Sequence, residues 1–283
     1  MELVLQRWSR SWLEWRPLSG AWRACVELLV FGARQAWASL FGGLLLVLVL
    51  VTRWYWPEAM PLARYDALFV AAIAIQIALL ATGLEHPREA AIILIFHVVG
   101  TAMEVFKTHM GSWTYPEDSV LRIGAVPLFS GFMYAAVGSY MARVVRIFDI
   151  RLDTYPPIPA TVMLAAAIYA NFFAHHFMPD LRIGLFVATA VLFGRVRMQF
   201  RLLDGTLAMP LLLAFVLVAT FIWVAENVAT WSSVWLYPNQ LHEWAPVSPA
   251  KLGSWFLLMI ISVVLVTLVH PPRRSDATSE AAA

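Results

Sequence analysis

Eight long apolar runs, separated by short polar connections, constrain this chain more than any other feature of its sequence. Crossing a bilayer core about 30 Å thick takes roughly 20 predominantly apolar residues. Lipid offers the backbone no hydrogen-bond partners, so each run is expected to be an α-helix. The predicted spans are residues 35–52, 66–84, 89–106, 124–144, 158–177, 183–198, 208–229 and 252–270. The sequence therefore predicts an all-α fold, a polytopic transmembrane helical bundle of about eight spans.

The composition excludes a large aqueous domain. Hydrophobic residues make up 61% of the 283 positions and charged residues only 13%, whereas soluble domains carry about 25% charge. The formal net charge of +2 gives no reason to expect a nucleic-acid partner. A single cysteine, Cys25, excludes an internal disulfide and a cysteine-based metal cluster. The sequence contains no nucleotide, nicotinamide or haem motif, so no cofactor is expected.

Basic residues fall mainly in alternate connecting segments. Placing the N-terminus in the cytoplasm puts 14 of the 20 lysine and arginine residues inside, which the positive-inside rule favours. The inside set is Arg7, Arg10, Arg16, Arg23, Arg34, Arg88, Arg143, Arg146, Arg151, Arg195, Arg197, Arg201, Arg273 and Arg274, and the outside set is Arg53, Arg64, Lys107, Arg122, Arg182 and Lys251. Both termini are therefore predicted to be cytoplasmic. Residues 1–34 are predicted to be an amphipathic segment on the cytoplasmic surface, and residues 272–283 a disordered cytoplasmic tail.

One motif recurs at an offset of 122 residues. The segments EVFKTHMGSWTYPE and ENVATWSSVWLYPN share E-x3-T-x4-W-x-Y-P without a gap. The matched pairs are Glu104 with Glu226, Thr108 with Thr230, Trp113 with Trp235, Tyr115 with Tyr237, and Pro116 with Pro238. The offset carries the first four predicted spans onto the last four, and an even number of spans leaves both halves in the same orientation. Residues 35–151 and 152–271 are therefore predicted to be two parallel four-helix repeats.

The repeat places Glu104 and Glu226 at the outer ends of equivalent spans. A carboxylate within a span is costly and is by default a hypothesis of a functional site. We therefore predict both glutamates to be catalytic, together with Glu117 in the following loop. A structural alternative stays open, in which Glu104 pairs with Lys107 one helical turn away and Glu226 simply surfaces near Trp231.

Other polar and aromatic residues gather on the same outer side. The electron-rich faces of the repeated aromatic residues suit stabilisation of a cation. The predicted substrate-binding residues are Trp113, Tyr115, Trp235, Tyr237, Lys107, Arg122 and Asn171. No metal is predicted, because no spacing typical of metal ligands is present. A weaker alternative is a zinc or iron site built from His109, His175, His176 and His242; hydrogen bonding of these histidines to loops or lipid headgroups also stays open.

The stretch HVVGTAMEVFKTHMGSWTYPEDSVLRIGAVPLFSGFMYAAVGSY, from His97 to Tyr140, resembles a bacterial integral membrane family known only as domain of unknown function 817. This resemblance covers nearly the whole chain and implies a bacterial plasma-membrane protein without implying an activity. A more distant resemblance is to membrane carotenoid enzymes, the lycopene cyclase domains and carotenoid hydratases. It is carried by Glu104, Trp113, Tyr115, Val126, Pro127 and Leu128. The cyclase pattern has two glutamates where this chain has Phe129 and Ser130, a departure that argues against cyclisation.

An acid–base reaction on a lipid is the predicted function. Hydrating or cyclising an isoprenoid double bond requires an acid to protonate an alkene, and an apolar environment keeps a glutamic acid protonated. The expected partners are membrane lipids and an apolar isoprenoid or other lipid substrate at the outer leaflet. A small-solute or proton-coupled transporter and a non-catalytic lipid-binding protein remain alternatives, and so does assembly into a homo-oligomer.

Overall fold

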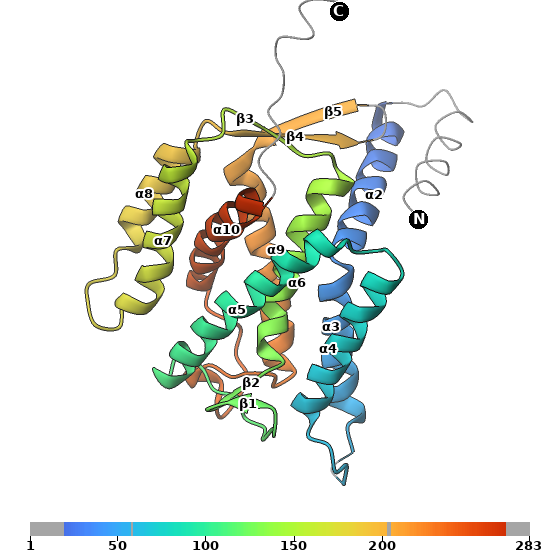
Figure 1. Ribbon diagram of the computed structural model, residues 1–283, viewed down its shortest axis with the longest axis vertical. Helices are drawn as coiled ribbons and strands as arrows, with labels where there is room; N and C mark the ends of the chain where they lie inside the picture. Colours follow the sequence, from blue (N-terminus) through green and yellow to red (C-terminus); the bar gives the residue numbers. More distant parts are fainter. Residues whose placement is uncertain (1–19, 58, 203–204, 270–283) are drawn as a thin grey trace, which may run out of the picture.

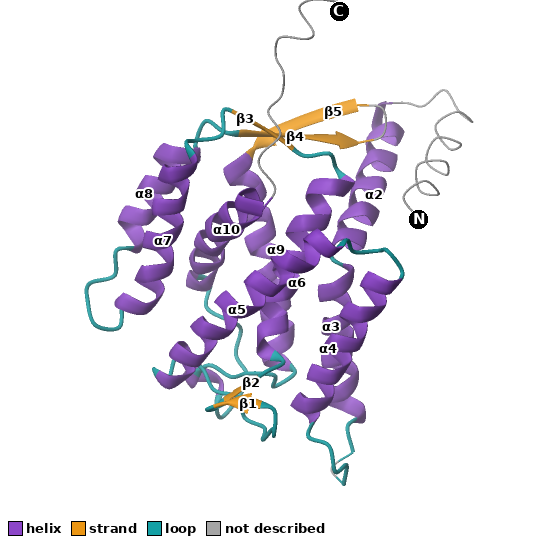
Figure 2. Cartoon of the chain, viewed as in Figure 1, coloured by secondary structure: helices purple, strands orange, loops and turns teal. Residues whose placement is uncertain are grey.

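The computed structural model describes residues 20–57, 59–202 and 205–269, in a mainly helical arrangement (Figures 1 and 2). The helices are α2 (Gly20–Ala38), α3 (Leu40–Tyr55), α4 (Arg64–Ala81), α5 (Pro87–His109), α6 (Ser130–Ile147), α7 (Ile158–Ala174), α8 (Arg182–Phe193), α9 (Leu211–Trp231) and α10 (Ala250–Val269), with a 3-10 turn η1 (Pro238–Gln240). The strands are β1 (Arg122–Ile123), β2 (Val126–Pro127), β3 (Arg151–Asp153), β4 (Arg197–Leu202) and β5 (Gly205–Pro210). The predicted C-terminal tail, and the predicted amphipathic segment as far as residue 19, lie outside the described residues.

The helices form a bundle with two flanks (Figure 1). Helices α3 and α4 lie on one flank and α7 and α8 on the other, with α5, α6, α9 and α10 between them. Strands β3, β4 and β5 cap one end of the bundle, which we call the sheet end. The opposite end carries the connections 110–129 and 232–249, and we call it the loop end.

Four helices of the described chain, α4, α5, α9 and α10, are long and apolar enough to cross a membrane. Helices α2 and α3 meet at a bend of 73° and pass the same test together, so they make a fifth candidate span. Helix α2 continues past the predicted boundary at residue 35, and the break falls at Ser39, between the two helices. These spans make the chain an integral membrane protein.

The predicted span over residues 183–198 is cut short in the structure. Helix α8 has only 12 residues, which at 1.5 Å per residue extends about 18 Å and falls short of a bilayer core. The apolar run stops at Gly194, and Arg195 and Arg197 follow. The chain leaves the helix there and continues into β4.

The three-stranded sheet is a departure from the predicted all-α fold. Strand β4 pairs antiparallel with both β3 and β5. Its residues alternate, so that Phe200 and Leu202 are buried while Arg201 between them is exposed, as expected for a strand with one face on the core. The buried pair packs with Phe148, the residue that follows α6, and with Val30 of α2. Six residues of period-two pattern beside long apolar runs are a weak signal, which is why the sequence did not reveal the sheet.

Contacts between helices come in matched sets. Helix α3 packs on α4 and α6, and α7 packs on α8 and α10. Helix α5 packs on α6, and α9 packs on α10. Across the middle of the bundle, α3 contacts α9 and α7 contacts α5. Each of these contacts in the first half of the chain therefore has a counterpart in the second half, whereas the packing of α2 on α6 has none among the helix pairs of the described chain.

Small residues let α5 and α6 approach closely, as is common in membrane helix pairs. A Cβ atom added at Gly100 would collide with the ring of Tyr134, and one added at Gly138 would press on Phe96. The two helices are therefore held in one register, and this register brings Tyr134 next to the side of α5 that carries Glu104.

Candidate functional site

The segments after α5 and α9 turn back toward the bundle in the same way. Helix α5 is followed by Gly111 with φ of 70°, and α9 by Ser233 with φ of 55°. A residue in this left-handed conformation commonly ends a helix, because it allows the next amides to bond back to the last carbonyls. The bonds are present in both segments: Ser112 N–H donates to the Lys107 carbonyl at 2.9 Å, and Val234 N–H donates to the Ala229 carbonyl at 3.1 Å. The repeated Trp and Tyr residues are therefore directed back over their helices.

The two returning segments pair with each other at the loop end. Thr114 and Leu236 form an isolated antiparallel bridge, in which each backbone N–H donates to the other residue's carbonyl at 2.9 Å. Helix α4 anchors the same region, because Tyr65 OH donates to the Val234 carbonyl at 2.8 Å. The side chain of Asp66 accepts hydrogen bonds from backbone amides of the first segment. These contacts fix the position of the aromatic residues relative to the spans.

Glu104 is buried at the centre of an aromatic network, with only 3% of its surface exposed. Its Oε2 accepts hydrogen bonds from Trp113 Nε1 at 2.8 Å and Tyr115 OH at 2.6 Å. Its Oε1 accepts a third from Tyr134 OH, on α6, at 2.7 Å. Hydrogen bonds donated to a carboxylate favour its ionised form over the neutral acid. The alternative that Glu104 pairs with Lys107 is wrong, because Lys107 contacts two histidines instead.

Glu226 occupies the corresponding position on α9 and is 4% exposed. Tyr237 OH donates to its Oε1, and Trp255 Nε1 on α10 donates to its Oε2 at 2.7 Å. The tyrosine that lies 11 residues after the glutamate is thus a donor in both segments. Trp235 has no such role, because the tryptophan that reaches Glu226 comes from α10. Because Glu226 is buried, the alternative that it surfaces near Trp231 is wrong.

The hydroxyl groups of Tyr115 and Tyr237 stay protonated under any ordinary condition. Burial, followed by the negative charge of Glu104, raises the pKa of Tyr115 well above its usual value. Burial, followed by the charge of Glu226, raises the pKa of Tyr237 in the same way. Both phenols therefore act as hydrogen-bond donors to the carboxylates rather than as proton acceptors.

Lys251, at the start of α10, lies between the two networks. Its Nζ is 4.3 Å from the ring centroid of Tyr237 and 5.4 Å from that of Trp113. Contacts of this kind stabilise a cation against an aromatic face. Within the part of the chain that the structure describes, no carboxylate oxygen comes within 4.0 Å of this ammonium. Its charge is left facing the open space beside the two glutamates.

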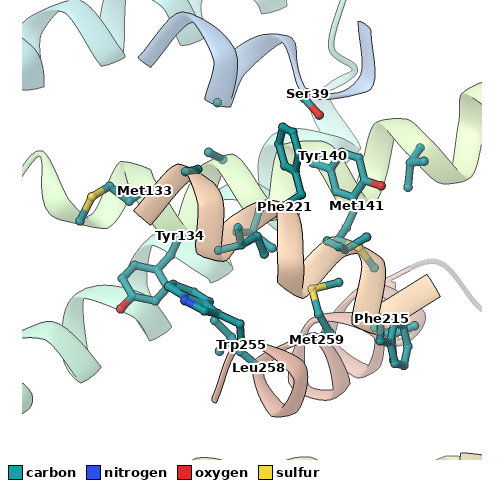
Figure 3. Close-up of a pocket in the computed structure, with 18 of the residues that line it drawn as sticks. Ser39, Met133, Tyr134, Tyr140, Met141, Phe215, Phe221, Trp255, Leu258 and Met259 are labelled. Atoms are coloured by element: carbon teal, nitrogen blue, oxygen red, sulfur yellow. The ribbon is translucent and has the colours of Figure 1, made fainter. Parts of the chain in front are cut away.

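That space is a cavity of about 1580 Å³, larger than the pockets that hold drug-sized ligands. Glu104, Glu226 and Lys251 form part of its wall, and most of the rest is apolar surface of α3, α6, α9 and α10. Figure 3 shows Tyr134 and Trp255 lying together in the lining, with Phe215 and Met259 farther along. The cavity thus combines a long apolar wall with a polar group of two acids and one amine.

A second polar group lies in the cavity wall, between the ends of α5 and α7. Lys107 is 7% exposed, and its Nζ lies 3.2 Å from His175 Nε2 and 3.0 Å from His176 Nε2. His175 Nδ1 lies 2.8 Å from the Asn171 carbonyl, which assigns the proton to Nδ1 and leaves Nε2 to accept from Lys107. Burial and then the nearby Lys107 charge lower the pKa of His176. Asn171 also binds Asp180 and the Leu181 amide, so it shapes the turn that follows α7.

With this geometry in view, comparison with known proteins identifies the family. Residues 27–263 match the family described as "Protein of unknown function (DUF817)". The chain belongs to the DUF817 family. It is 39% identical over 256 residues to the uncharacterized protein YoaT of Bacillus subtilis, which covers 90% of this chain and 96% of YoaT. Among solved structures it is similar to the Insig homologue MvINS of Mycobacterium vanbaalenii, with 16% identity, a TM-score of 0.47, and 67% of this chain and 98% of MvINS covered. A cross-linked trimer of MvINS gives 15% identity, a TM-score of 0.46 and the same coverage.

Several predicted site residues of this DUF817 protein lie away from the glutamates. Glu117 forms an ion pair with the buried Arg64. Arg122 is exposed and lies 3.6 Å from Asp118. His109 and His242 are both exposed. Among the described residues, no three histidine, cysteine or acidic side chains are grouped closely enough to hold one metal ion.

Three residues of the site were not singled out from the sequence: Tyr134, Trp255 and Lys251. Tyr134 lies 30 residues after Glu104, and Trp255 lies 29 residues after Glu226. The 122-residue offset relates Tyr134 to position 256, which is one residue away from Trp255. A search for identical residues at this exact offset therefore misses the pair. An aromatic donor about thirty residues after each repeated glutamate was the available signal.

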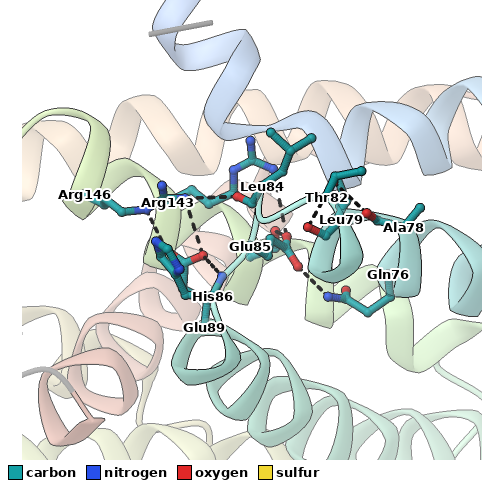
Figure 4. A network of polar contacts seen from close by, with 11 residues as sticks. Gln76, Ala78, Leu79, Thr82, Leu84, Glu85, His86, Glu89, Arg143 and Arg146 are labelled. Atoms are coloured by element: carbon teal, nitrogen blue, oxygen red, sulfur yellow. Dashed lines mark hydrogen bonds and ion pairs between the residues drawn. The ribbon is translucent and has the colours of Figure 1, made fainter. Parts of the chain in front are cut away.

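A buried charged cluster at the sheet-end side of α5 was also unforeseen (Figure 4). Glu85 accepts hydrogen bonds from Ser139 Oγ at 2.5 Å and from Gln76. Arg143, 1% exposed, has one guanidinium nitrogen 4.0 Å from Glu85 and a cation–π contact with Trp37 at 5.4 Å. The charges of this cluster lie on α6 and in the connection between α4 and α5.

Proposed function

We propose that this DUF817 protein is a multi-pass acid–base enzyme of the bacterial plasma membrane that acts on an isoprenoid or other lipid held in its cavity. The observation that carries the proposal is the pair of buried glutamates in the wall of one large, mostly apolar cavity. Burying two carboxylates in a membrane bundle is costly. An apolar substrate with an alkene is the kind of ligand whose chemistry needs them there.

The two glutamates suit different steps of such a reaction. We assign Glu226, which accepts two hydrogen bonds, as the proton donor, and Glu104, whose position is fixed by three hydrogen bonds, as the group that orients water and receives its proton. In a hydration, Glu226 gives its proton to one alkene carbon, and the electron-rich ring of Trp235, which also lines the cavity, stabilises the resulting cation. Water adds to the cation and loses a proton to Glu104, so substrate and water combine without another reactant. Transfer of that proton back to Glu226 resets the site.

A duplicated four-helix unit is part of the same proposal. The helix contacts occur in matched sets, and the helix-ending residues Gly111 and Ser233 are 122 positions apart. The bridge between Thr114 and Leu236 pairs two residues related by that same offset, as expected where a local two-fold axis passes between two copies. These observations support two parallel repeats of four helices each, with the glutamates meeting at the repeat interface.

The proposed orientation places the sheet end in the cytoplasm and both termini with it. Most arginines in the connections of the described chain lie at the sheet end, among them Arg151, Arg195 and Arg197 next to or within the sheet, which agrees with the positive-inside rule. Reporter fusions after Arg151 and after Glu243 test it. The first is expected to report the cytoplasm and the second the outside, and the reverse pattern contradicts the orientation.

The enzymatic proposal is tested by lipid analysis of purified protein and of membranes that contain it. Glu104→Gln and Glu226→Gln keep the size of each side chain and remove its titrating proton. Both are expected to bind the same lipid as the unmodified protein, but without converting it. Glu243→Gln is the matched control, because Glu243 is exposed at the loop end. Full conversion by both variants, or a protein that binds no lipid, contradicts the proposal.

Transport is a second candidate, favoured by one observation. The cavity lining also includes Glu89 and Arg146, near the charged cluster on the sheet-end side, so polar groups reach it from both ends. Purified protein in liposomes that enclose a pH-sensitive dye tests this candidate. A proton flux that is lost in Glu104→Gln supports transport over lipid chemistry, and the absence of any flux rejects it.

A further inference from the structure

Basic side chains from four parts of the chain gather in the loop-end wall of the cavity. Lys107, His175, Arg182 and Lys251 all line it. They come from the last turn of α5, the end of α7, the first residue of α8 and the start of α10. Segments so far apart in the chain meet at this wall only because the bundle folds around the cavity. The cluster is therefore a feature of the site and not of one charged stretch of sequence.

The acidic groups nearby already have partners. Asp180 lies 3.2 Å from Arg182 in an ion pair and also accepts from Asn171. Glu104 and Glu226 accept hydrogen bonds from the aromatic residues. Lys107 is left with two imidazole nitrogens as its contacts, and neither carries a negative charge.

Lys107 is therefore a buried cation without a carboxylate beside it. Among the residues that the structure describes, none of the ion pairs within 4.0 Å includes this side chain. A buried charge that lacks a counter-charge is costly. An ammonium has three N–H donors, and the two histidines use two of them, so the third is available to an acceptor in the cavity. Arg182 likewise has donors beyond those facing Asp180.

We propose that the cavity binds an amphipathic anion, whose phosphate or carboxylate group is held by Lys107 and Arg182. The hydrocarbon chain then extends along the apolar wall formed by α9 and α10, past Phe215 and Met259. The carbons next to the anionic group lie beside Lys251 and the two glutamates. This inference rests on the proposed function and deepens it, because it names which end of the lipid the protein holds.

The test measures binding of dodecyl phosphate to the full-length protein in maltoside micelles by isothermal titration calorimetry. Lys107→Gln and Arg182→Gln are each expected to weaken binding at least about tenfold, since each removes a partly buried charge partner. Arg122→Gln is the matched control and is expected to bind as the unmodified protein does, because Arg122 is an exposed loop-end arginine. Size-exclusion profiles confirm that each variant is folded.

Two further probes distinguish a lipid headgroup from a free anion and test whether the hydrocarbon chain contributes to binding. Inorganic phosphate and uncharged dodecanol are each expected to bind at least about tenfold more weakly than dodecyl phosphate, because each lacks one half of the ligand. Inorganic phosphate that binds as tightly as dodecyl phosphate overturns the lipid assignment in favour of a free anion. Dodecanol that binds as tightly, or equal binding by all three arginine and lysine variants, overturns the anionic site.

The outcome is distinguishable from that of the acid–base proposal. Glu104→Gln is expected to bind dodecyl phosphate normally while losing lipid conversion. If the binding pattern holds and Glu104→Gln converts lipid fully, the anionic site stands and the acid–base function falls. If conversion requires Glu104 while Lys107→Gln binds dodecyl phosphate as the unmodified protein does, the acid–base function stands and the anionic site falls.

Discussion

Replacing Tyr134 by phenylalanine removes one hydroxyl group from the Glu104 network and leaves the ring in place. The hydroxyl lies 2.7 Å from Glu104 Oε1 in a buried setting. A hydrogen bond to a charged group contributes about 1.5–3 kcal/mol, whereas neutral bonds between membrane helices average about 0.6 kcal/mol. If Glu104 is ionised, Tyr134→Phe is expected to lower the free energy of unfolding by about 1.5–3 kcal/mol.

Tyr169→Phe provides the matched control. Tyr169 OH on α7 also donates to α5, but to the neutral Val99 carbonyl, at 3.0 Å. Titration with sodium dodecyl sulfate in mixed micelles measures both variants, and Tyr134→Phe is expected to cost roughly 1–2 kcal/mol more than Tyr169→Phe. The excess should disappear in a Glu104→Gln background, as a double-mutant cycle would detect. Equal costs of the two substitutions in the native background would refute an ionised Glu104.

Three other features of the loop end can be tested by substitution or titration. Ser233→Gly is expected to raise the free energy of unfolding by about 0.5–1 kcal/mol, because φ at this position is 55° and glycine adopts this angle without strain. The same titration measures the change, and a destabilised variant contradicts the assigned conformation. Thr114→Cys with Leu236→Cys, in a Cys25→Ser background, is expected to form a disulfide under mild oxidation, seen as a mobility shift in gels, and free thiols would contradict the bridge. The pKa of His176 is lowered in the folded protein from its ordinary value of 6.5. As pH falls, the unfolded protein therefore binds a proton at this residue before the folded protein does. The melting temperature is therefore expected to fall as pH decreases below 6.5, and to fall less steeply in His176→Gln. If the slope is the same in the variant, His176 does not contribute to this pH dependence.

Much of the site could be inferred from residue spacing alone. The recurrence of E-x3-T-x4-W-x-Y-P singles out Glu104 and Glu226, and both lie in the wall of one cavity. Spacing within one segment is a local property, so it also identified Tyr115 and Tyr237 as neighbours of the glutamates. The roles of these residues in chemistry stay predictions.

Contacts between distant segments could not be read in the same way. Which helix supplies Tyr134 or Trp255 depends on how α6 and α10 pack, and the approach of α6 to α5 depends on single glycines such as Gly100. Hydropathy counts apolar residues without measuring where a helix ends, so it extended α8 across residues that belong to β4. Lys107 lies in the cavity wall, but its histidine partners come from the other half of the chain and could not be read from local spacing.

Incorporation of deuterium from heavy water tests the central claim most directly, because an acid that protonates an alkene carbon must deliver a solvent-derived hydrogen to it. Membranes containing the unmodified protein or the Glu104→Gln, Glu226→Gln double variant are incubated in D₂O, and their lipids are compared by mass spectrometry. The account predicts that one class of lipid gains carbon-bound deuterium with the unmodified protein and not with the double variant. If no lipid gains deuterium in a protein-dependent way, or both proteins give the same labelling, the two glutamates do not perform acid–base chemistry on a lipid.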